Sequence, residues 1–180
     1  MQKKQHNLKF VEYDTNKHKE EINAWQSEIN NKVYGYDRFV KYGLLELGCL
    51  QDILDCYAPI PTSQELVKTY LVFSEEKCVG VVVLDWCSYE TSKNNSLNVF
   101  HLLVRPSEMR HGYGSAILER IKKDGKSLID REYSDINLSI DKTNIPCQEM
   151  SEKCGFNCEG QAGSYYLYSF KENDNALERE

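Results

Sequence analysis

The residues with the clearest chemical potential lie in the stretch Val104–Leu118, which reads VRPSEMRHGYGSAIL. An apolar run ends at a proline, and a polar turn with two glycines, Gly112 and Gly114, leads into a helical pattern. The first N–H groups of a helix have no partner within it, and the helix dipole adds partial positive charge there. Glycines at these positions permit positive φ angles and a close approach of the backbone to a ligand. Together with Arg110 and His111, the turn predicts a site for a phosphate or pyrophosphate group.

An ordinary turn without a ligand is the alternative, because glycines are common between a strand and a helix, and their spacing alone is a weak signal. The turn is not a P-loop, since no G-K-[ST] sequence follows it. It also lacks the third glycine of a dinucleotide-binding fingerprint, whose position is taken by Ile117. The residues therefore indicate an anion site without identifying the ligand.

A second segment carries the signals of a short helix with a polar start. Asn144 stands at the expected N-cap, Pro146 lies in the first turn, and Gly155 follows the expected end. These signals predict a helix from Ile145 to Cys154. An asparagine at such a place can cap the helix with its side-chain oxygen.

Seven cysteines occur in the chain, an odd number with irregular spacing. Cys147, Cys154 and Cys158 lie close together but form no C-x-x-C pair, so a zinc or redox site finds little support. Reduced cysteines that serve as small core residues in a reducing cytoplasm are the favoured interpretation. We therefore expect no bound metal.

Hydrophobic periodicity predicts the elements that would position these residues. The predicted strands are Leu8–Tyr13, Thr69–Phe73, Cys78–Leu84, Leu97–Val104, Ile136–Ile140, Phe156–Glu159 and Tyr165–Phe170. One helical pattern has its apolar residues at Ile22, Trp25, Ile29 and Val33. A second has them at Leu47, Leu50, Ile53, Leu54 and Tyr57, and it ends at Pro59 and Pro61. A third follows Gly114 and fades near Gly125, and Ser88–Ser96 reads as a loop. This order, β-α-α-β-β-β-α-β-α-β-β, predicts a mixed sheet with helices packed on it.

The composition fits one soluble domain. The chain has 180 residues, of which 41% are apolar and 28% charged, and its formal net charge is −6. The negative charge argues against a protein that coats nucleic acid. The basic start leads into no apolar segment of a secretory signal, and no run approaches the length of a membrane span. We expect a cytoplasmic protein without a membrane partner.

The two motifs together resemble the GNAT superfamily of acyl-CoA-dependent N-acetyltransferases. In that family a strand ends in V-x-P, and x-x-[R/Q]-x-x-G-x-[G/A] and a helix follow; the matching residues here are Val104, Pro106, Gly112 and Gly114. The second block, an Asn after the next strand and a helix closing in K-x-G-F, is matched by Asn144, Lys153, Gly155 and Phe156. The resemblance extends from about Thr69 to the last strand.

This resemblance implies an α/β (α+β) fold: a mixed, mostly antiparallel sheet with a splayed central pair of parallel strands, and helices on both faces. It implies a single acetyltransferase domain over residues 1–170, followed by a frayed polar tail at 171–180.

The resemblance also implies where acetyl-CoA, the co-substrate, would bind. Its pantetheine arm would pair like an extra strand with the backbone of Leu102, Leu103 and Val104. Its pyrophosphate would rest on the turn formed by Met109, Arg110, His111, Gly112, Tyr113, Gly114 and Ser115. Asn144 would contact the cofactor arm, cap its helix, or do both.

Members of this family transfer the acetyl group by direct attack of an amine on the thioester. A lysine-like amine has a pKa of about 10.4, so the site must take up a proton, directly or through water. The carboxylate that often serves as the base falls at Asn98, which cannot accept a proton. His101 on the same strand is the nearest titratable alternative, and a half-buried structural histidine is the competing interpretation.

Two further positions depart from the family pattern. The Arg or Gln that helps to hold the pyrophosphate turn is Met109, and Arg110 could take its place. The Tyr that protonates the leaving thiolate falls at Ser151, whose hydroxyl can at best position water. Tyr165, Tyr166 and Tyr168 are alternative donors, although tyrosines on a strand more often serve packing.

Two functions remain open at this point. The first is an acetyl-CoA-dependent N-acetyltransferase that acts on a primary amine of a small molecule, peptide or protein. The second is a CoA-binding module of the same fold with little or no turnover, acting as a sensor or interaction protein. A homodimer is compatible with the resemblance, although no sequence pattern demands one.

Overall fold

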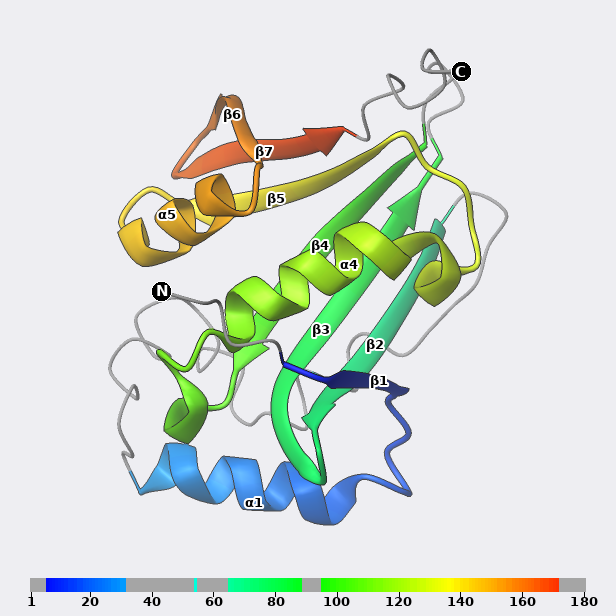
Figure 1. The fold of residues 1–180 in the computed structure, drawn as a ribbon, viewed down its shortest axis with the longest axis vertical. Helices are drawn as coiled ribbons and strands as arrows, with labels where there is room; N and C mark the ends of the chain where they lie inside the picture. Colours follow the sequence, from blue (N-terminus) through cyan, green and yellow to red (C-terminus); the bar gives the residue numbers. More distant parts are fainter. Residues whose placement is uncertain (1–5, 32–53, 55–64, 89–94, 172–180) are drawn as a thin grey trace.

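The computed structural model describes residues 6–31, 54, 65–88 and 95–171, and the elements within them follow the predicted order (Figure 1). The strands are β1 Leu8–Glu12, β2 Glu65–Ser74, β3 Lys77–Cys87, β4 Ser96–Val104, β5 Asp135–Asp141, β6 Asn157–Ala162 and β7 Tyr165–Lys171. The helices are α1 Lys19–Asn30, the 3₁₀ helix η2 Pro106–Glu108, α4 Tyr113–Ile129 and α5 Ile145–Lys153. The predicted second helix lies outside the described residues except for Leu54, which is helical and buried.

The described strands form one seven-stranded sheet in the order β1-β2-β3-β4-β5-β7-β6. Every neighbouring pair is antiparallel except β4 and β5, which are parallel. Their ladder is short: residues 96–98 of β4 pair with residues 135–137 of β5, and the pairing stops there. The two strands then diverge (Figure 1), so the expected fold class, with its splayed parallel pair, is confirmed.

A bulge in β4 lies directly after the last pair with β5. Val99 is opposite Leu84 and His101 is opposite Val83, so Phe100 is an extra residue with no counterpart on β3. An extra residue shifts the alternation of a strand by one, which exchanges the faces to which its side chains point. His101 therefore lies on a different face of the sheet from Val99.

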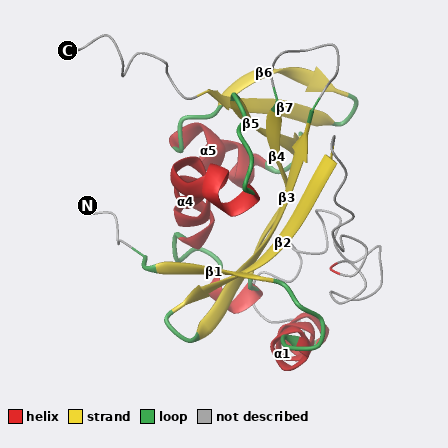
Figure 2. Ribbon diagram, turned by 90° about the vertical axis from the view of Figure 1, so that its right-hand side faces the viewer, coloured by secondary structure: helices red, strands yellow, loops and turns green. Residues whose placement is uncertain are grey.

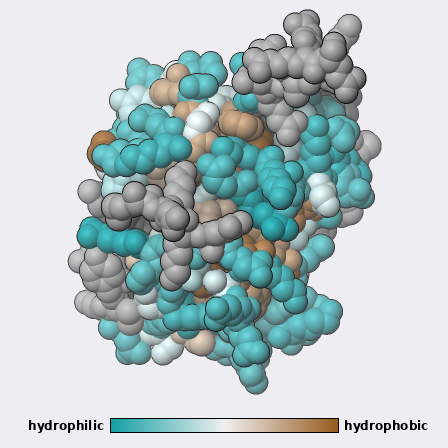
Figure 3. Space-filling model, in the orientation of Figure 1, coloured by the Kyte–Doolittle hydropathy of each residue, from teal (hydrophilic) through white to brown (hydrophobic). Residues whose placement is uncertain are grey.

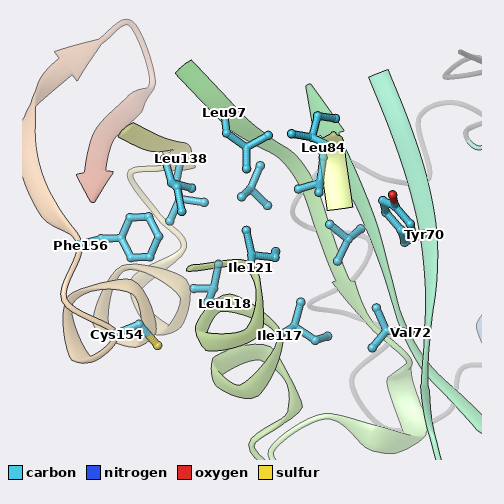
Figure 4. Packing of buried hydrophobic residues seen from close by; sticks show 14 of the residues in the cluster. Tyr70, Val72, Leu84, Leu97, Ile117, Leu118, Ile121, Leu138, Cys154 and Phe156 are labelled. Carbon is cyan, nitrogen blue, oxygen red and sulfur yellow. The ribbon is translucent and has the colours of Figure 1, made fainter. Parts of the chain in front are cut away.

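The first of two apolar clusters lies between the sheet and the helices α4 and α5. Ile117, Leu118 and Ile121 of α4 point toward Leu84 and Leu97 of the sheet (Figure 4). Leu138, Cys154 and Phe156 continue this cluster beneath α5. The apolar stripe of α4 is thus what holds the helix across the diverging strands.

The second cluster lies on the other face and packs α1 against the sheet (Figure 2). It consists of Ile22, Trp25, Ile29, Leu54, Leu71, Cys78, Val81 and Leu103. The predicted apolar face of α1 is confirmed for its three described members, Ile22, Trp25 and Ile29, each at most 1% exposed. Helices therefore cover both faces, as the fold class requires.

Several boundaries differ from the prediction: β2 begins at Glu65 instead of Thr69, β3 continues to Cys87 instead of Leu84, and β6 continues to Ala162 instead of Glu159. Helix α4 does not fade near Gly125 but continues to Ile129 and ends at Asp130, which adopts a left-handed φ of 57°. Gly125 is buried inside the helix. A Cβ at this position would overlap the hydroxyl of Tyr133, so the glycine allows close packing and does not end the helix. Strand β7 includes Lys171, the first residue assigned to the tail; residues 172–180 lie outside the described part.

The surface above α4 and α5 is largely hydrophilic, with apolar patches between polar side chains (Figure 3). Within the described ranges, no helix is long and apolar enough to cross a membrane. The expected absence of a membrane partner and the cytoplasmic location stay predictions.

Candidate functional site

The turn before α4 exposes backbone N–H groups at a helix start. Met109 donates its N–H to the carbonyl of Pro106 at 3.3 Å, and Ala116 donates its N–H to the carbonyl of Gly112 at 3.1 Å. The N–H groups of residues 111–115 lie between these two bonds along the chain. Among the described residues, none of them has a backbone acceptor. His111 and Gly112 are exposed, and the following three residues are half-buried. A row of N–H groups at the positive end of a helix dipole is an anion-binding arrangement.

The two glycines of the turn serve different purposes. Gly112 has a φ of +88° at the N-cap of α4, a conformation that favours glycine. Gly114 is helical and has no positive φ, so the expectation of a positive φ is wrong at this position. A Cβ on Gly114 would lie 2.7 Å from Sδ of Met150, which means that this glycine lets α4 approach α5 closely.

His6 lies against this turn although it is more than a hundred positions away in the sequence. Its Nε2 donates a hydrogen bond to the carbonyl of His111 at 2.9 Å, and its ring lies 4.3 Å from that of Tyr113. A Cβ on Gly112 would be 3.4 Å from the same nitrogen. The sequence offered no signal for this contact, because β1 brings His6 to the turn only once the sheet has formed.

Met109 faces away from the anion-binding turn. Its side chain packs against the apolar cluster of α1, where it is partly buried. An apolar residue at this position therefore anchors the turn to α1 instead of binding an anion. The neighbouring Arg110 is exposed and has a left-handed φ of 65°.

Arg105, which the sequence analysis did not single out, fixes the end of β4. It is buried, its Nε donates to Glu28 at 2.7 Å, and one of its terminal nitrogens donates to Glu21 at 2.8 Å. The backbone N–H of Ser107 reaches the second oxygen of Glu28 at 3.4 Å. This network ties the segment just before the turn to α1.

Beyond Asn98, the edge of β4 that faces β5 has no strand partner within the described part of the chain. The side chains of Leu102 and Val104 pack on the cluster beneath α4, and Leu103 packs on the cluster of α1. The side chains are thus held on both faces, and no described strand pairs with this edge at residues 102–104. An extended ligand can pair with such an edge as an added strand does.

Asn144 caps α5, as its position in the sequence predicted. Its side-chain oxygen accepts the N–H of Cys147 at 3.3 Å, and Gly155 beyond the helix end has a φ of +86°. The side-chain NH₂ group of Asn144 is not used by this cap. The predicted contact to a cofactor arm stays a prediction.

Replacing Asn144 distinguishes the cap from a ligand contact. Asn144→Ala should lower the free energy of unfolding by about 1 kcal/mol because the cap is lost. Asn144→Asp keeps the capping oxygen and should leave stability nearly unchanged. If the NH₂ group donates to acetyl-CoA, both variants should weaken its binding about tenfold, or about 1.4 kcal/mol, in calorimetric titrations. Unchanged binding in both variants would leave Asn144 with the cap alone.

The bulge at Phe100 places His101 on the α1 face of the sheet. The two rings meet edge to face at 4.8 Å. Burial lowers the pKa of His101 below its ordinary value of 6.5. The imidazole is therefore neutral at pH 7 and able to accept a proton, but only weakly basic; its catalytic role stays a prediction.

The lowered pKa of His101 predicts a pH dependence of stability. Between its folded pKa and 6.5, the unfolded state binds more protons than the folded state. The stabilisation is therefore complete above 6.5 and is lost as the pH falls through this window, by at most about 1.4 kcal/mol per pH unit. In urea unfolding at several pH values, His101→Gln should show a shallower loss of stability on acidification than the wild type. Parallel curves would show that His101 does not titrate in this way.

Ser151 is completely buried, and its hydroxyl has no hydrogen-bond partner in the part of the chain that the structure describes. This geometry does not test the prediction that Ser151 positions water for the leaving thiolate. Of the alternative tyrosines, Tyr168 lies in the core and donates to Glu152 at 3.1 Å. Burial, followed by the Glu152 hydrogen bond, raises the pKa of Tyr168 to about 12, which makes it a poorer acid. Tyr165 is exposed and Tyr166 half-buried.

The late cysteines do not come together as a metal centre in the described part. Cys147, Cys154 and Cys158 are all free thiols there, as are Cys78 and Cys87. No group of three or more His, Cys, Asp or Glu residues within those ranges could hold a metal ion.

Comparison with known proteins identifies one sequence family. A sequence family described as acetyltransferase (GNAT) family matches residues 47–156. No curated protein sequence matches the chain.

Three solved structures share the fold. The N-acetyltransferase PseH of Campylobacter jejuni in complex with acetyl coenzyme A is 18% identical, with 92% of this chain and 99% of that chain covered and a TM-score of 0.55. A variant of the spermidine N-acetyltransferase SpeG from Vibrio cholerae is 14% identical, with 91% and 93% covered and a TM-score of 0.57. A Bacillus subtilis acetyltransferase in complex with CoA is 14% identical, with 93% and 99% covered and a TM-score of 0.54.

Proposed function

Because the chain belongs to the acetyltransferase (GNAT) family, we propose that it is an acetyl-CoA-dependent N-acetyltransferase acting on a primary amine. The observation that carries this proposal is the arrangement of two features at the ends of one strand. Near the start of β4, the strand separates from β5 after Asn98. Beyond the C-terminal end of β4 lies the row of N–H groups of residues 111–115.

The residues present fit acetyl-CoA. The unpaired edge of β4 at residues 102–104 can pair with the amides of the pantetheine arm, and the turn at residues 111–115 can hold the pyrophosphate. The N–H of Met109 is not available for this, because it donates to Pro106. Arg110 and His111 would add side-chain donors beside the turn. Two of the similar solved structures contain acetyl coenzyme A or CoA, which supports the same ligand here.

The transfer needs an amine, a thioester and a route for two protons. The amine nitrogen forms a bond to the thioester carbonyl carbon, the carbon–sulfur bond breaks, and CoA leaves as a thiolate that takes up a proton. The attacking amine gives up its own proton to the site or to water. A backbone N–H on the free edge of β4 would stabilise the negative charge that develops on the carbonyl oxygen.

The second function is a CoA-binding module with little turnover. It is favoured because the residues at the expected proton-transfer positions are poorly suited to transfer protons. Asn98 cannot act as a base, His101 is weakly basic because of its burial, and Ser151 is completely buried. Each of these would slow transfer without preventing the cofactor from binding.

Turnover distinguishes the two functions. Purified protein is mixed with acetyl-CoA and a panel of polyamines, amino sugars, amino acids, peptide N-termini and protein lysines, and acetylated products are identified by mass spectrometry. The proposal expects thiol release together with one acetylated amine class. Binding of acetyl-CoA without any product would favour the module, and absence of binding would contradict both.

The expected setting follows from the same family. We propose that the protein works in a reducing cytoplasm, which the free thiols of all five described cysteines support. A homodimer is part of this proposal, and light scattering of the purified protein checks it.

A further inference from the structure

A row of polar side chains crosses the α1 face of the sheet where β4 and β5 separate. The backbone ladders place Asp85 of β3 opposite Asn98 of β4, Asn98 opposite Asn137 of β5, and Asn137 opposite Ser169 of β7. We call these four residues the polar row. Their sequence neighbours Leu84, Trp86, Leu97, Val99, Ile136, Leu138, Tyr168 and Phe170 all belong to the cluster beneath α4 and α5. Since side chains alternate along a strand, the polar row points to the opposite face.

The polar row lies where an acceptor has to approach. The pair Asn98–Asn137 is the last one before the gap between β4 and β5, which begins at the next residue. On the other face, α4, α5 and their apolar cluster cover this region (Figure 4). Within the described ranges, the face with the polar row is therefore the side from which a polar molecule would reach the start of the gap.

Asp85 supplies to the polar row a negative charge that no described residue balances. Among the described residues, both of its hydrogen bonds go to one oxygen: Oδ2 accepts the Nδ2 of Asn98 at 3.4 Å and the thiol of Cys87 at 3.2 Å. Within the described ranges, Oδ1 has no partner, and no Lys, Arg or His forms an ion pair with this half-buried carboxylate. An ammonium group would supply both the missing donor and the missing charge.

Ser169 at the other end of the polar row is an independent sign of a ligand. It is 7% exposed, and its hydroxyl has no hydrogen-bond partner among the described residues. Leaving a buried polar group without a partner costs about 1–3 kcal/mol, so such groups call for an explanation. Asp135, two residues before Asn137 on the same face, also has a buried carboxylate oxygen without a partner.

We infer that the polar row binds the acyl acceptor and that this acceptor is a hydroxylated cationic amine, with its ammonium on Asp85 and its hydroxyl groups on Asn137 and Ser169. This inference rests on the proposed function. Strands lie about 4.8 Å apart, so the row spans roughly 14 Å, which is long enough to hold a disaccharide. Amide and hydroxyl side chains along most of this length match hydroxyl groups better than further ammonium groups.

The test is a calorimetric titration of the CoA-loaded protein with a glucosamine disaccharide. Asp85→Asn keeps the shape of the side chain and should weaken binding at least tenfold; Ser169→Ala should weaken it about threefold to tenfold. Asp130→Asn is the matched control, because its carboxylate is 88% exposed and lies at the end of α4, which covers the opposite face of the sheet, and it should bind like the wild type. In turnover assays Asp85→Asn should raise KM for the amine more than it lowers kcat, with KM for acetyl-CoA unchanged.

Spermidine, a cationic amine without hydroxyl groups, is the comparison ligand. The wild type should bind it at least tenfold more weakly than the disaccharide. Equal or tighter binding of spermidine, no binding of the disaccharide at millimolar concentration, or wild-type binding by Asp85→Asn would each overturn the inference. Failure of the proposed function has a different signature, namely loss of acetyl-CoA binding or of all turnover in the wild type.

Discussion

Gly112→Asp is expected to weaken acetyl-CoA binding by on the order of 100-fold, or about 2.7 kcal/mol, while the chain stays folded. The new carboxylate would stand at the N-cap of α4, among the N–H groups of residues 111–115 that are free to bind an anion. Its negative charge would repel the pyrophosphate. Its Cβ would also come within 3.4 Å of Nε2 of His6, which restricts the space over the turn. Isothermal titration calorimetry with acetyl-CoA measures the effect.

Two further variants separate charge from backbone strain. Gly163→Asp places the same residue at a φ of +55° in a turn where nothing lies within 4 Å of the new Cβ, so it should bind acetyl-CoA normally. Gly112→Asn retains the left-handed backbone, which Asn tolerates, and adds no charge, so its binding should fall between those of the wild type and Gly112→Asp. Normal binding by Gly112→Asp would place the pyrophosphate elsewhere.

Arg105→Met is expected to lower the free energy of unfolding by about 3 kcal/mol, the largest stability effect foreseen for a single charged side chain. Arg105 is 10% exposed and lies between Glu21 and Glu28, whose side chains are 28% and 20% exposed. Methionine fills a similar volume but leaves two carboxylates close together without their cation. Since Glu28 also accepts the N–H of Ser107, the segment before the anion-binding turn should loosen as well. Urea unfolding followed by circular dichroism measures the change.

The matched control for Arg105 is Arg120→Met. Arg120 pairs with Asp124 on the surface of α4 and is 47% exposed, so its loss should change the stability by no more than about 1 kcal/mol. Replacing Glu21 and Glu28 by Gln in the Arg105→Met background should restore part of the stability, because the unpaired charges are removed. Equal effects of Arg105→Met and Arg120→Met would show that burial adds nothing to the Arg105 network.

Features of the fold that depend on neighbours in sequence were predictable. The alternation of apolar residues identified all seven described strands, and the cap residues Asn144 and Gly155 placed α5 to within one residue. Gly125 was misjudged because a glycine inside a helix can end it or can admit a neighbour, and only the position of Tyr133 decides between these. At Gly114 the sequence indicated a positive φ or a close approach of a ligand; its φ is not positive, and its close neighbour is Met150 of α5.

The candidate site was predictable only in part. The anion-binding turn follows from a local sequence pattern, whereas His6, Arg105 and Asp85 act through partners on other elements. The face on which each side chain of β4 lies also escapes sequence patterning, since the bulge at Phe100 reverses the alternation halfway along the strand. Register and bulges are tertiary properties, and they decide which polar groups meet.

The central claim is that acetyl-CoA binds between β4 and β5 with its pyrophosphate on the turn before α4. A crystal structure of the protein with acetyl-CoA tests it most directly. We predict that the pantetheine arm lies along β4 beyond Asn98 and that pyrophosphate oxygens lie within hydrogen-bonding distance of the N–H groups of residues 111–115. Acetyl-CoA bound anywhere else, or a pyrophosphate that does not contact this turn, would contradict it.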